Sequence, residues 1–296
     1  MTTSHDPRLL AGIVDFAGLF PPAGLTMADA VAEYAAARSG AEAWMLGRFV
    51  LPAARLAEFT ATAPDAAHTA PWHLSAIVGD GSEPDAAAVA ALNAAGGAIV
   101  DSVECKPASP DGLDWLARTF AGLEVYVEVP AGPAAPAWLE QVAAHGLRGK
   151  VRTGGLAAGA FPAADDLAAF LEAAVRLGVP FKATAGLHHA VRGDYRLTYE
   201  PGSADAAMYG YLNVLLATTA LAAGHGVATA RDLLLRQDAA ALVIEAGGMR
   251  WGAVALDATA IARARTRHLL SFGSCSFREP SEEYRALAGA PATATR

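Results

Sequence analysis

The chain has 296 residues, of which 53% are apolar, and its formal net charge is −8 at pH 7. Its length suffices for one large barrel or two small domains with a full core, and the negative charge argues against a nucleic-acid-binding or anionic-membrane-binding surface. The start of the chain carries no apolar signal core, no apolar stretch is long enough to span a bilayer, and there are two cysteines, so we expect a cytoplasmic protein that binds neither nucleic acid nor a membrane.

Eight short apolar runs have the length and composition of buried parallel strands. They lie at residues 11–16, 43–50, 72–79, 97–106, 123–130, 147–154, 179–186 and 268–277. Helices rich in alanine and leucine are predicted between them at 27–39, 84–95, 110–121, 133–145 and 163–177. Thr26 is predicted to cap the first of these helices and Gly178 to follow the end of the last. Eight strands with seven or more helices predict a single α/β domain over residues 1–296, a (β/α)8 TIM barrel.

The connection before the eighth strand is much longer than the others. About 80 residues separate the seventh and eighth strands, far more than short loops and one helix require. We predict an insertion at about 190–257, with helices at 206–223 and 228–237 and a hairpin that turns at Gly247-Gly248. It could form a lid, a dimer contact that makes the protein a homo-oligomer, or a decoration, and the sequence leaves these three open. The tail at 286–296 is predicted to be loose.

Lysine is rare in this chain and is placed non-randomly. Only Lys106, Lys150 and Lys182 are lysine among 22 basic residues, and each lies at the end of a predicted strand. Arginine cannot replace lysine where a neutral amine acts as nucleophile or base. We therefore interpret the three lysines as a candidate active site, with chance retention or structural ion pairs as the alternative.

The predicted strands bring several of these polar side chains to one end of the barrel. Catalytic groups of such barrels lie at the carboxyl ends of the strands, and residues two apart on a strand share a side. The pairs that share a side are Glu104 with Lys106, Lys150 with Arg152, and Lys182 with Thr184. Two amines held close together lower the pKa of one of them, and a neutral lysine attacks carbonyl groups to form a Schiff base.

Four motifs on the fourth, sixth, seventh and eighth predicted strands resemble deoxyribose-phosphate aldolase and related class I aldolases. They are VDSV (100–103), KVRTGG (150–155), FKATAGL (181–187) and FGSCSF (272–277). The resemblance implies that Lys150 is the Schiff-base lysine and that Lys182 lowers the pKa of Lys150. It also implies that Ser276, with Gly273 and the backbone near Gly186, faces a phosphate.

The chain departs from that family at three points. Arg152 stands where the aldolases have a small residue, Ala185-Gly186 stands where they have Gly-Gly, and the long insertion is foreign to them. The acid of the fourth strand would be Asp101 by the resemblance, whereas side-chain alternation favours Glu104.

Further candidate residues follow other strands. His188 is a candidate proton shuttle, and His189 a candidate substrate ligand, although a histidine pair in a loop also commonly caps a helix. Asp15 and Arg48 are predicted to end the first and second strands, where substrate contacts are built, and a structural ion pair is the competing interpretation. Arg48, Arg152 and the turn that contains Ser274 would hold a carboxylate or phosphate.

Three functions therefore remain open. The favoured one is a Schiff-base lyase of the aldolase type that acts on a small anionic carbonyl compound, with proton transfer by Glu104, Lys106 or a histidine, and without a metal or another cofactor. The second is a metal-dependent hydrolase or lyase, whose ligands would be Glu104, Glu128, His188 and His189, although no His-x-His or His-Glu-x-x-His motif is present. The third is a non-catalytic barrel that acts as a ligand sensor or as an assembly subunit.

Overall fold

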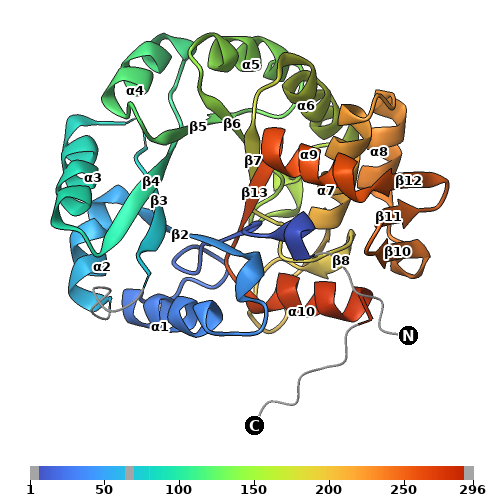
Figure 1. The fold of residues 1–296 in the computed structure, drawn as a ribbon, viewed down its shortest axis with the longest axis horizontal. Helices are drawn as coiled ribbons and strands as arrows, with labels where there is room; N and C mark the ends of the chain where they lie inside the picture. The colour runs from blue at the N-terminus through green and yellow to red at the C-terminus, as the bar shows by residue number, and fades with distance from the viewer. Residues whose placement is uncertain (1–6, 64–69, 80, 290–296) are drawn as a thin grey trace.

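The computed structural model describes residues 7–63, 70–79 and 81–289. Eight parallel strands form a closed barrel in the order β1-β13-β7-β6-β5-β4-β3-β2 (Figure 1). The strands are β1 (Val14–Phe16), β2 (Leu46–Pro52), β3 (Trp72–Ile77), β4 (Ala98–Cys105), β5 (Glu124–Val129), β6 (Arg148–Arg152), β7 (Phe181–Thr184) and β13 (Leu269–Ser274). The prediction of a (β/α)8 barrel is confirmed. Each predicted run contains one barrel strand, except that β2 extends two residues past the run predicted at 43–50.

Helices surround the barrel and cover its outer side (Figure 1). They are α1 (Met27–Arg38), α2 (Leu56–Thr62), α3 (Glu83–Ala95), α4 (Leu113–Thr119), α5 (Ala135–Ala144), α6 (Ala164–Leu177), α7 (Tyr211–Ala222), α8 (Val227–Leu235), α9 (Ala258–Arg267) and α10 (Arg278–Leu287). Short 3-10 helices lie at Pro7–Leu10, Ala43–Met45, Ala53–Arg55, Pro110–Gly112, Ala158–Ala160 and Ala239–Ala241. Both predicted helix ends are confirmed: Thr26 accepts a hydrogen bond from the Asp29 amide, and Gly178 ends α6 with φ +67°.

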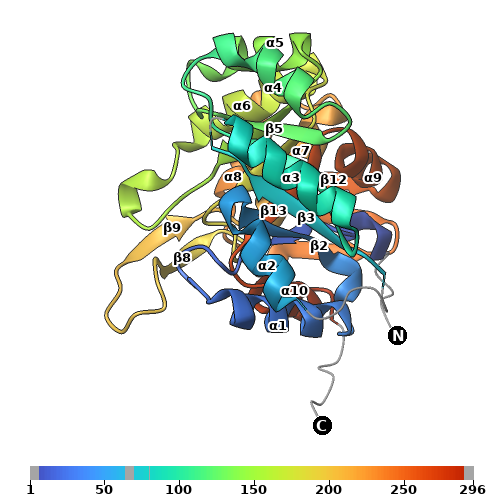
Figure 2. The same ribbon diagram turned by 90° about the vertical axis from the view of Figure 1, so that its left-hand side faces the viewer.

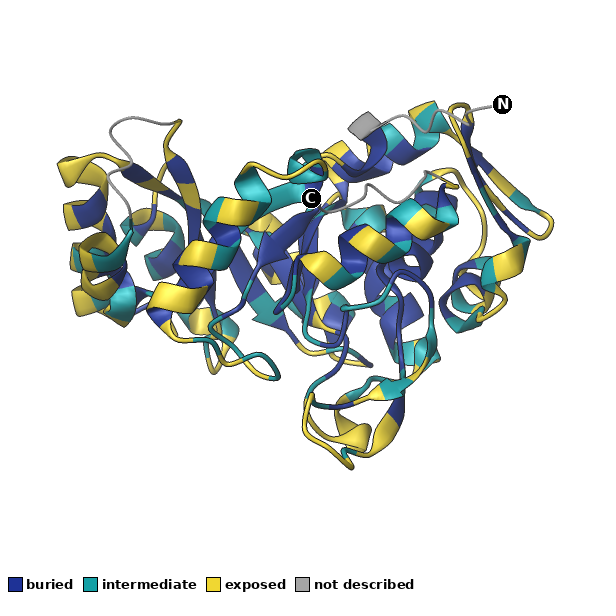
Figure 3. Ribbon diagram, turned by 90° about the horizontal axis from the view of Figure 1, so that it is seen from below, coloured by how far each residue is buried: buried dark blue, intermediate teal, exposed yellow. Residues whose placement is uncertain are grey.

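Several charged and polar side chains are buried on the barrel strands. Most of the apolar core lies between strands and helices, where buried side chains such as Leu74, Val127 and Phe181 pack against the helical ring. Figure 3 shows the strands buried and the helices exposed on their outer sides. The buried charged and polar strand residues are Asp15, Ser75, Ser102, Glu104, Lys150, Lys182, Ser271 and Ser274. Such groups are costly to bury without partners, so we expect each of them to have a hydrogen-bond or ionic partner inside the barrel.

The insertion between β7 and β13 contains two small antiparallel sheets. One is the hairpin of β8 (Gly193–Arg196) and β9 (Asp205–Met208), which projects from one side of the barrel (Figure 2). The other joins β10 (Leu242–Glu245), β11 (Gly248–Trp251) and β12 (Val254–Asp257). The predicted hairpin at Gly247-Gly248 is confirmed by β10 and β11, and β12 adds a third strand.

Two predicted boundaries are wrong. Residues 206–208 belong to β9, and α7 begins at Tyr211. Gly210, between them, passes so close to the backbone of Val191 that a Cβ atom at residue 210 would lie 2.4 Å from the Val191 Cα. The tail is not loose from residue 286, because α10 continues to Leu287 and Ala288 is buried. Residues 290–296 of the predicted tail lie outside the described residues.

Among the described helices, none has the length and apolar character needed to cross a membrane.

Candidate functional site

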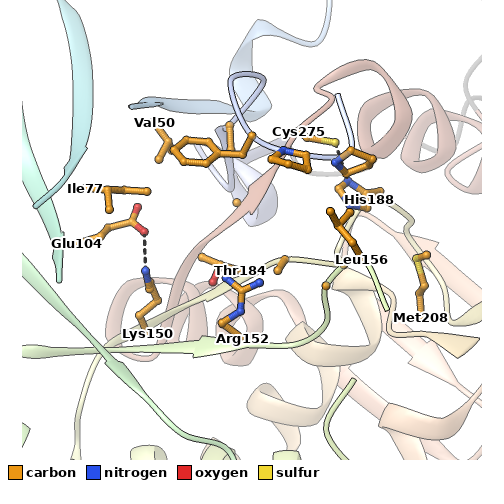
Figure 4. A pocket seen from close by; sticks show the side chains of 18 of the residues that line it. Val50, Ile77, Glu104, Lys150, Arg152, Leu156, Thr184, His188, Met208 and Cys275 are labelled. Carbon is orange, nitrogen blue, oxygen red and sulfur yellow. Dashed lines mark hydrogen bonds and ion pairs between the residues drawn. The ribbon is translucent and has the colours of Figure 1, made fainter. Parts of the chain in front are cut away.

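A pocket of about 240 Å³ opens at the carboxyl ends of the barrel strands. Figure 4 shows Glu104 and Lys150 at one end of the pocket and Leu156, His188 and Met208 at the other. The polar side chains that line it are Glu104, Lys150, Arg152, Thr184, His188 and Cys275. The apolar ones include Phe20, Pro21, Pro22, Val50, Ile77, Leu156, Leu197 and Met208. This is the end at which barrels of this kind carry their active sites.

Lys150 lies between two carboxylates at the floor of the pocket. Its Nζ is 3.2 Å from Glu104 Oε2 and 3.1 Å from Glu128 Oε2, and its side chain is 7% exposed. In the parallel register Lys150 pairs with Glu128 of β5 on one side and with Lys182 of β7 on the other. The amine therefore faces the pocket from within a nearly buried ionic cluster.

Lys182 lies deeper in the barrel and has no exposed surface. Its Nζ is 2.6 Å from both Asp15 Oδ2 and Glu104 Oε1, and it lies 5.4 Å from the centre of the Tyr126 ring. Burial by itself lowers the pKa of Lys182, but the charges of Asp15 and Glu104 outweigh it and raise the pKa above its ordinary value. Lys182 is thus a fixed positive charge. The prediction that it lowers the pKa of Lys150 stays a prediction.

Glu104 connects the two lysines. One of its oxygens accepts hydrogen bonds from Ser75 Oγ (2.9 Å) and Lys182, and the other contacts Lys150. Burial raises the pKa of Glu104, but the charges of Lys182 and Lys150 outweigh it and lower the pKa to about 2. Of the two acids of the fourth strand, the structure brings Glu104 to the lysines. Asp101 instead contacts Arg48 and His73.

Lys106 does not share a contact with Glu104. Its amine is 2.8 Å from Glu128 Oε1, and its side chain is 71% exposed, outside the pocket lining. Glu128 therefore bridges an exposed lysine and the pocket lysine. Burial raises the pKa of Glu128, but the charge of Lys150 and hydrogen bonds from both lysines lower it overall.

The two histidines after β7 have different surroundings. His188 lines the pocket, with Nδ1 3.3 Å from Ser274 Oγ and 3.4 Å from Cys275 Sγ. Burial, together with the charge of His189, lowers the pKa of His188 to about 4, so its ring is neutral at pH 7. His189 stacks on Tyr195, and its Nδ1 lies within hydrogen-bond distance of Glu283 Oε1, at 2.6 Å. It is therefore absent from the pocket lining where we predicted a substrate ligand.

Of the two arginines predicted to bind an anion, Arg152 lines the pocket and Arg48 does not. Arg152 and Thr184 line the pocket, and no ion pair of Arg152 is found in the described part of the chain. Arg48 does not end its strand as predicted, because β2 continues to Pro52. Its guanidinium contacts Asp101 at 2.6 Å and Glu124 at 3.0 Å, near the amino ends of the strands. The structural interpretation therefore holds for Arg48, and Arg152 remains as the anion-binding candidate.

Asp15 and the turn after β13 are also placed differently from the prediction. Asp15 lies in the middle of β1 and is buried, where Ser271 Oγ and the Arg48 amide donate hydrogen bonds to it. Gly273 lines the pocket, but neither Ser274 nor Ser276 does. The hydroxyl of Ser274 accepts the Ser276 amide at 3.3 Å, and the hydroxyl of Ser276 accepts the Glu279 amide at 3.2 Å. The hydroxyls of Ser274 and Ser276 therefore bind backbone amides of the turn that follows β13, instead of facing a phosphate as predicted.

The backbone after β7 is left-handed at two successive residues, Ala185 (φ +63°) and Gly186 (φ +74°). At Gly186 a Cβ would lie 2.8 Å from the Phe161 ring and 3.2 Å from the Cα of Gly154, so glycine is required there. Ala185 adopts this conformation with a side chain, at a cost of about 1 kcal/mol.

The ligand set of the metal hypothesis does not assemble. Within residues 7–63, 70–79 and 81–289, no group of three or more His, Cys, Asp and Glu side chains is arranged to hold a metal ion.

Glu128 belongs to the site through its contacts with Lys150 and Lys106, although the sequence suggests it only as a metal ligand. The sequence feature that indicates this position is the alternation in EVYVEV, which places Tyr126 and Glu128 on one side of β5.

No family model matches the chain, and no curated protein matches it significantly.

Proposed function

We propose that this protein is a Schiff-base lyase of the aldolase type, with Lys150 as its nucleophile. The observation that supports this most strongly is the position of Lys150. It is the lysine that lines the pocket, and its amine lies between two carboxylates that can hold and return a proton. Lys106 is exposed and Lys182 is sealed beneath the pocket, so neither competes for this role.

The chemistry begins when a carbonyl compound enters the pocket. A carboxylate beside Lys150 accepts a proton from its ammonium group, and the nitrogen forms a bond to the carbonyl carbon while the carbon–oxygen double bond opens. A second proton then passes from the nitrogen to the oxygen, which becomes a hydroxyl. The same carboxylate returns the proton, the hydroxyl leaves as water, and an iminium ion remains. Its positive charge lies where the ammonium charge was, so Glu104 and Glu128 stabilise it without rearrangement.

Carbon–carbon cleavage needs a base at the substrate hydroxyl. His188 is neutral and lines the pocket at the end opposite Lys150. It takes the hydroxyl proton as the carbon–carbon bond breaks, and the electron pair moves into the iminium group to form an enamine. Lys182 is already protonated and does not take part in proton transfer. Its charge holds Asp15 and Glu104 in place.

The substrate is a small anionic carbonyl compound. The guanidinium of Arg152 suits a carboxylate through its two-pronged hydrogen bonding, and Arg152 lies two residues after Lys150 on the same strand. The serine hydroxyls near Gly273 bind their own turn, which favours a carboxylate over a phosphate. The pocket volume is slightly below the ~300–1,000 Å³ of drug-sized sites.

Borohydride trapping tests this proposal. The protein is incubated with small aldehydes, ketones and 2-oxo acids, reduced, and digested, and the modified lysine is located by mass spectrometry. We expect one adduct, on Lys150, and no adduct after Lys150→Arg, which keeps the charge. Lys106→Arg is the matched control and retains the adduct. Absence of a Lys150 adduct over the whole panel, or equal trapping in Lys150→Arg, would overturn the proposal.

A further inference from the structure

The pocket continues away from Lys150 into a region walled by apolar side chains. Leu197 lies just after β8 and Met208 ends β9, so the inserted hairpin supplies two of these walls. Leu156, from the loop after β6, supplies a third. Figure 4 shows Leu156 and Met208 on the side of Arg152 that is remote from Glu104 and Lys150.

The hairpin has a small apolar cluster of its own, separate from the main core. Leu197, Ala206 and Met208 are buried there against Phe161 and Tyr195. A two-stranded hairpin is only marginally stable alone, and this cluster fixes its inner side at the pocket. The insertion therefore forms part of the binding site.

Exposed apolar side chains give a second, independent indication. Four large hydrophobic side chains are exposed among the described residues, and one of them, Leu156, lines this pocket and is 49% exposed. Tyr199, 54% exposed, lines a neighbouring pocket, and its hydroxyl lies 3.6 Å from Sγ of Cys275, which lines both pockets. Apolar surface left open at a pocket mouth is typical of a ligand-binding site.

The titratable groups at this end carry no charge at neutral pH. His188 is neutral, and burial raises the pKa of the Cys275 thiol to about 11. Glu279 contacts Tyr199 but does not line the pocket. A substituent that extends past Arg152 thus meets neutral and apolar groups, and a charged substituent would lose its hydration without a partner.

We infer that Leu156, Leu197 and Met208 form a subsite for an apolar chain, and that the substrate is a carbonyl carboxylate with such a chain. The carbonyl part rests on the proposed function. The carboxylate lies at Arg152, and the chain runs toward the hairpin. The insertion thereby selects substrates by the length of this chain.

Calorimetric titration with acetate, butanoate, pentanoate and hexanoate tests the subsite without any carbonyl group. We expect the dissociation constant to fall roughly fourfold per methylene from butanoate to hexanoate. Arg152→Gln should weaken all four acids to a similar extent. Leu156→Ser should weaken hexanoate by roughly threefold or more and leave acetate unchanged.

Val227→Ser is the matched control, because Val227 is 47% exposed on α8 and lies outside this pocket. It should bind every acid as the unaltered protein does. Affinity that is independent of chain length, or equal effects of Leu156→Ser and Val227→Ser, would overturn the subsite. If affinity rises with chain length but borohydride traps no adduct, the proposed Schiff-base chemistry is wrong and the apolar subsite is retained.

Discussion

Lys150 and Lys182 are register partners on adjacent strands and share one carboxylate, Glu104, which binds each of them through a different oxygen. The arrangement divides two roles between similar side chains. Lys182 is fully enclosed and fixed by two acids, whereas Lys150 reaches the pocket. Glu104 is fixed by three donors, so it orients the Lys150 amine without itself facing bulk water.

Lys182→Met is expected to destabilise the protein by about 3–5 kcal/mol, because it leaves Asp15 and Glu104 buried without their shared cation. Urea unfolding of the purified protein measures the change. Lys106→Met, which removes an exposed lysine, should alter the free energy of unfolding very little. Similar stabilities for the two variants would show that the buried cluster does not depend on Lys182.

Acid should destabilise the fold through Glu104. Its pKa falls from 4.5 to about 2 on folding, so the unfolded chain binds the proton more tightly. The stabilisation is then complete above pH 4.5 and is lost as the pH falls toward 2, by an amount on the order of 3 kcal/mol. Urea unfolding at a series of pH values measures this. Glu104→Gln should show a shallower decline, and an unchanged slope would contradict the assignment.

Ala185→Gly should stabilise the protein by about 0.5–1 kcal/mol. The left-handed backbone at Ala185 (φ +63°) strains any residue with a Cβ atom. Glycine removes this strain, and we expect the free energy gained in the folded state to exceed the free energy lost because glycine gives the unfolded chain more conformational entropy. Thermal unfolding measures the change. Ala157→Gly is the control, because Ala157 is exposed with φ −126°, and glycine there should destabilise. Loss of stability in Ala185→Gly would show that its methyl group contributes more by packing than it costs in strain.

The barrel strands could be predicted because each is a buried apolar run bounded by loop residues. Alternation along such runs also gave the sides of Glu104 and Lys150. What it could not give is the register between strands, which pairs Glu128 with Lys150 and makes Glu128 part of the site.

The other differences have separate causes. Immediately before α7, Gly210 passes close to the backbone of Val191, a contact that the local sequence pattern does not reveal. The hairpin of β8 and β9 was missed because its two strands are short and their buried residues pack on a local cluster. Arg48 was placed at the wrong end because β2 runs on through Pro52, a residue that is uncommon within strands.

Glu128 is expected to be the carboxylate that exchanges the proton with Lys150. Glu104 is 2% exposed and bound by Ser75 and both lysines, whereas Glu128 is 10% exposed and its second partner, Lys106, lies in water. With pyruvate as the probe, Glu128→Gln should slow the formation of the reducible Lys150 adduct by roughly 100-fold. Rapid mixing followed by borohydride quenching measures the rate.

Lys106→Met separates this catalytic role from a structural one. Lys150, Lys106 and Cys105 are the titratable groups that interact with Glu128 among the described residues. Removing the Lys106 charge removes an influence that lowers the pKa of Glu128, so that pKa should rise. The base then becomes protonated at higher pH, and the acid side of the pH–rate profile should move upward while the plateau rate is retained. An unmoved profile, together with a normal rate in Glu128→Gln, would assign the proton transfer to Glu104, because Glu104 is the other carboxylate in contact with the Lys150 amine within the described residues.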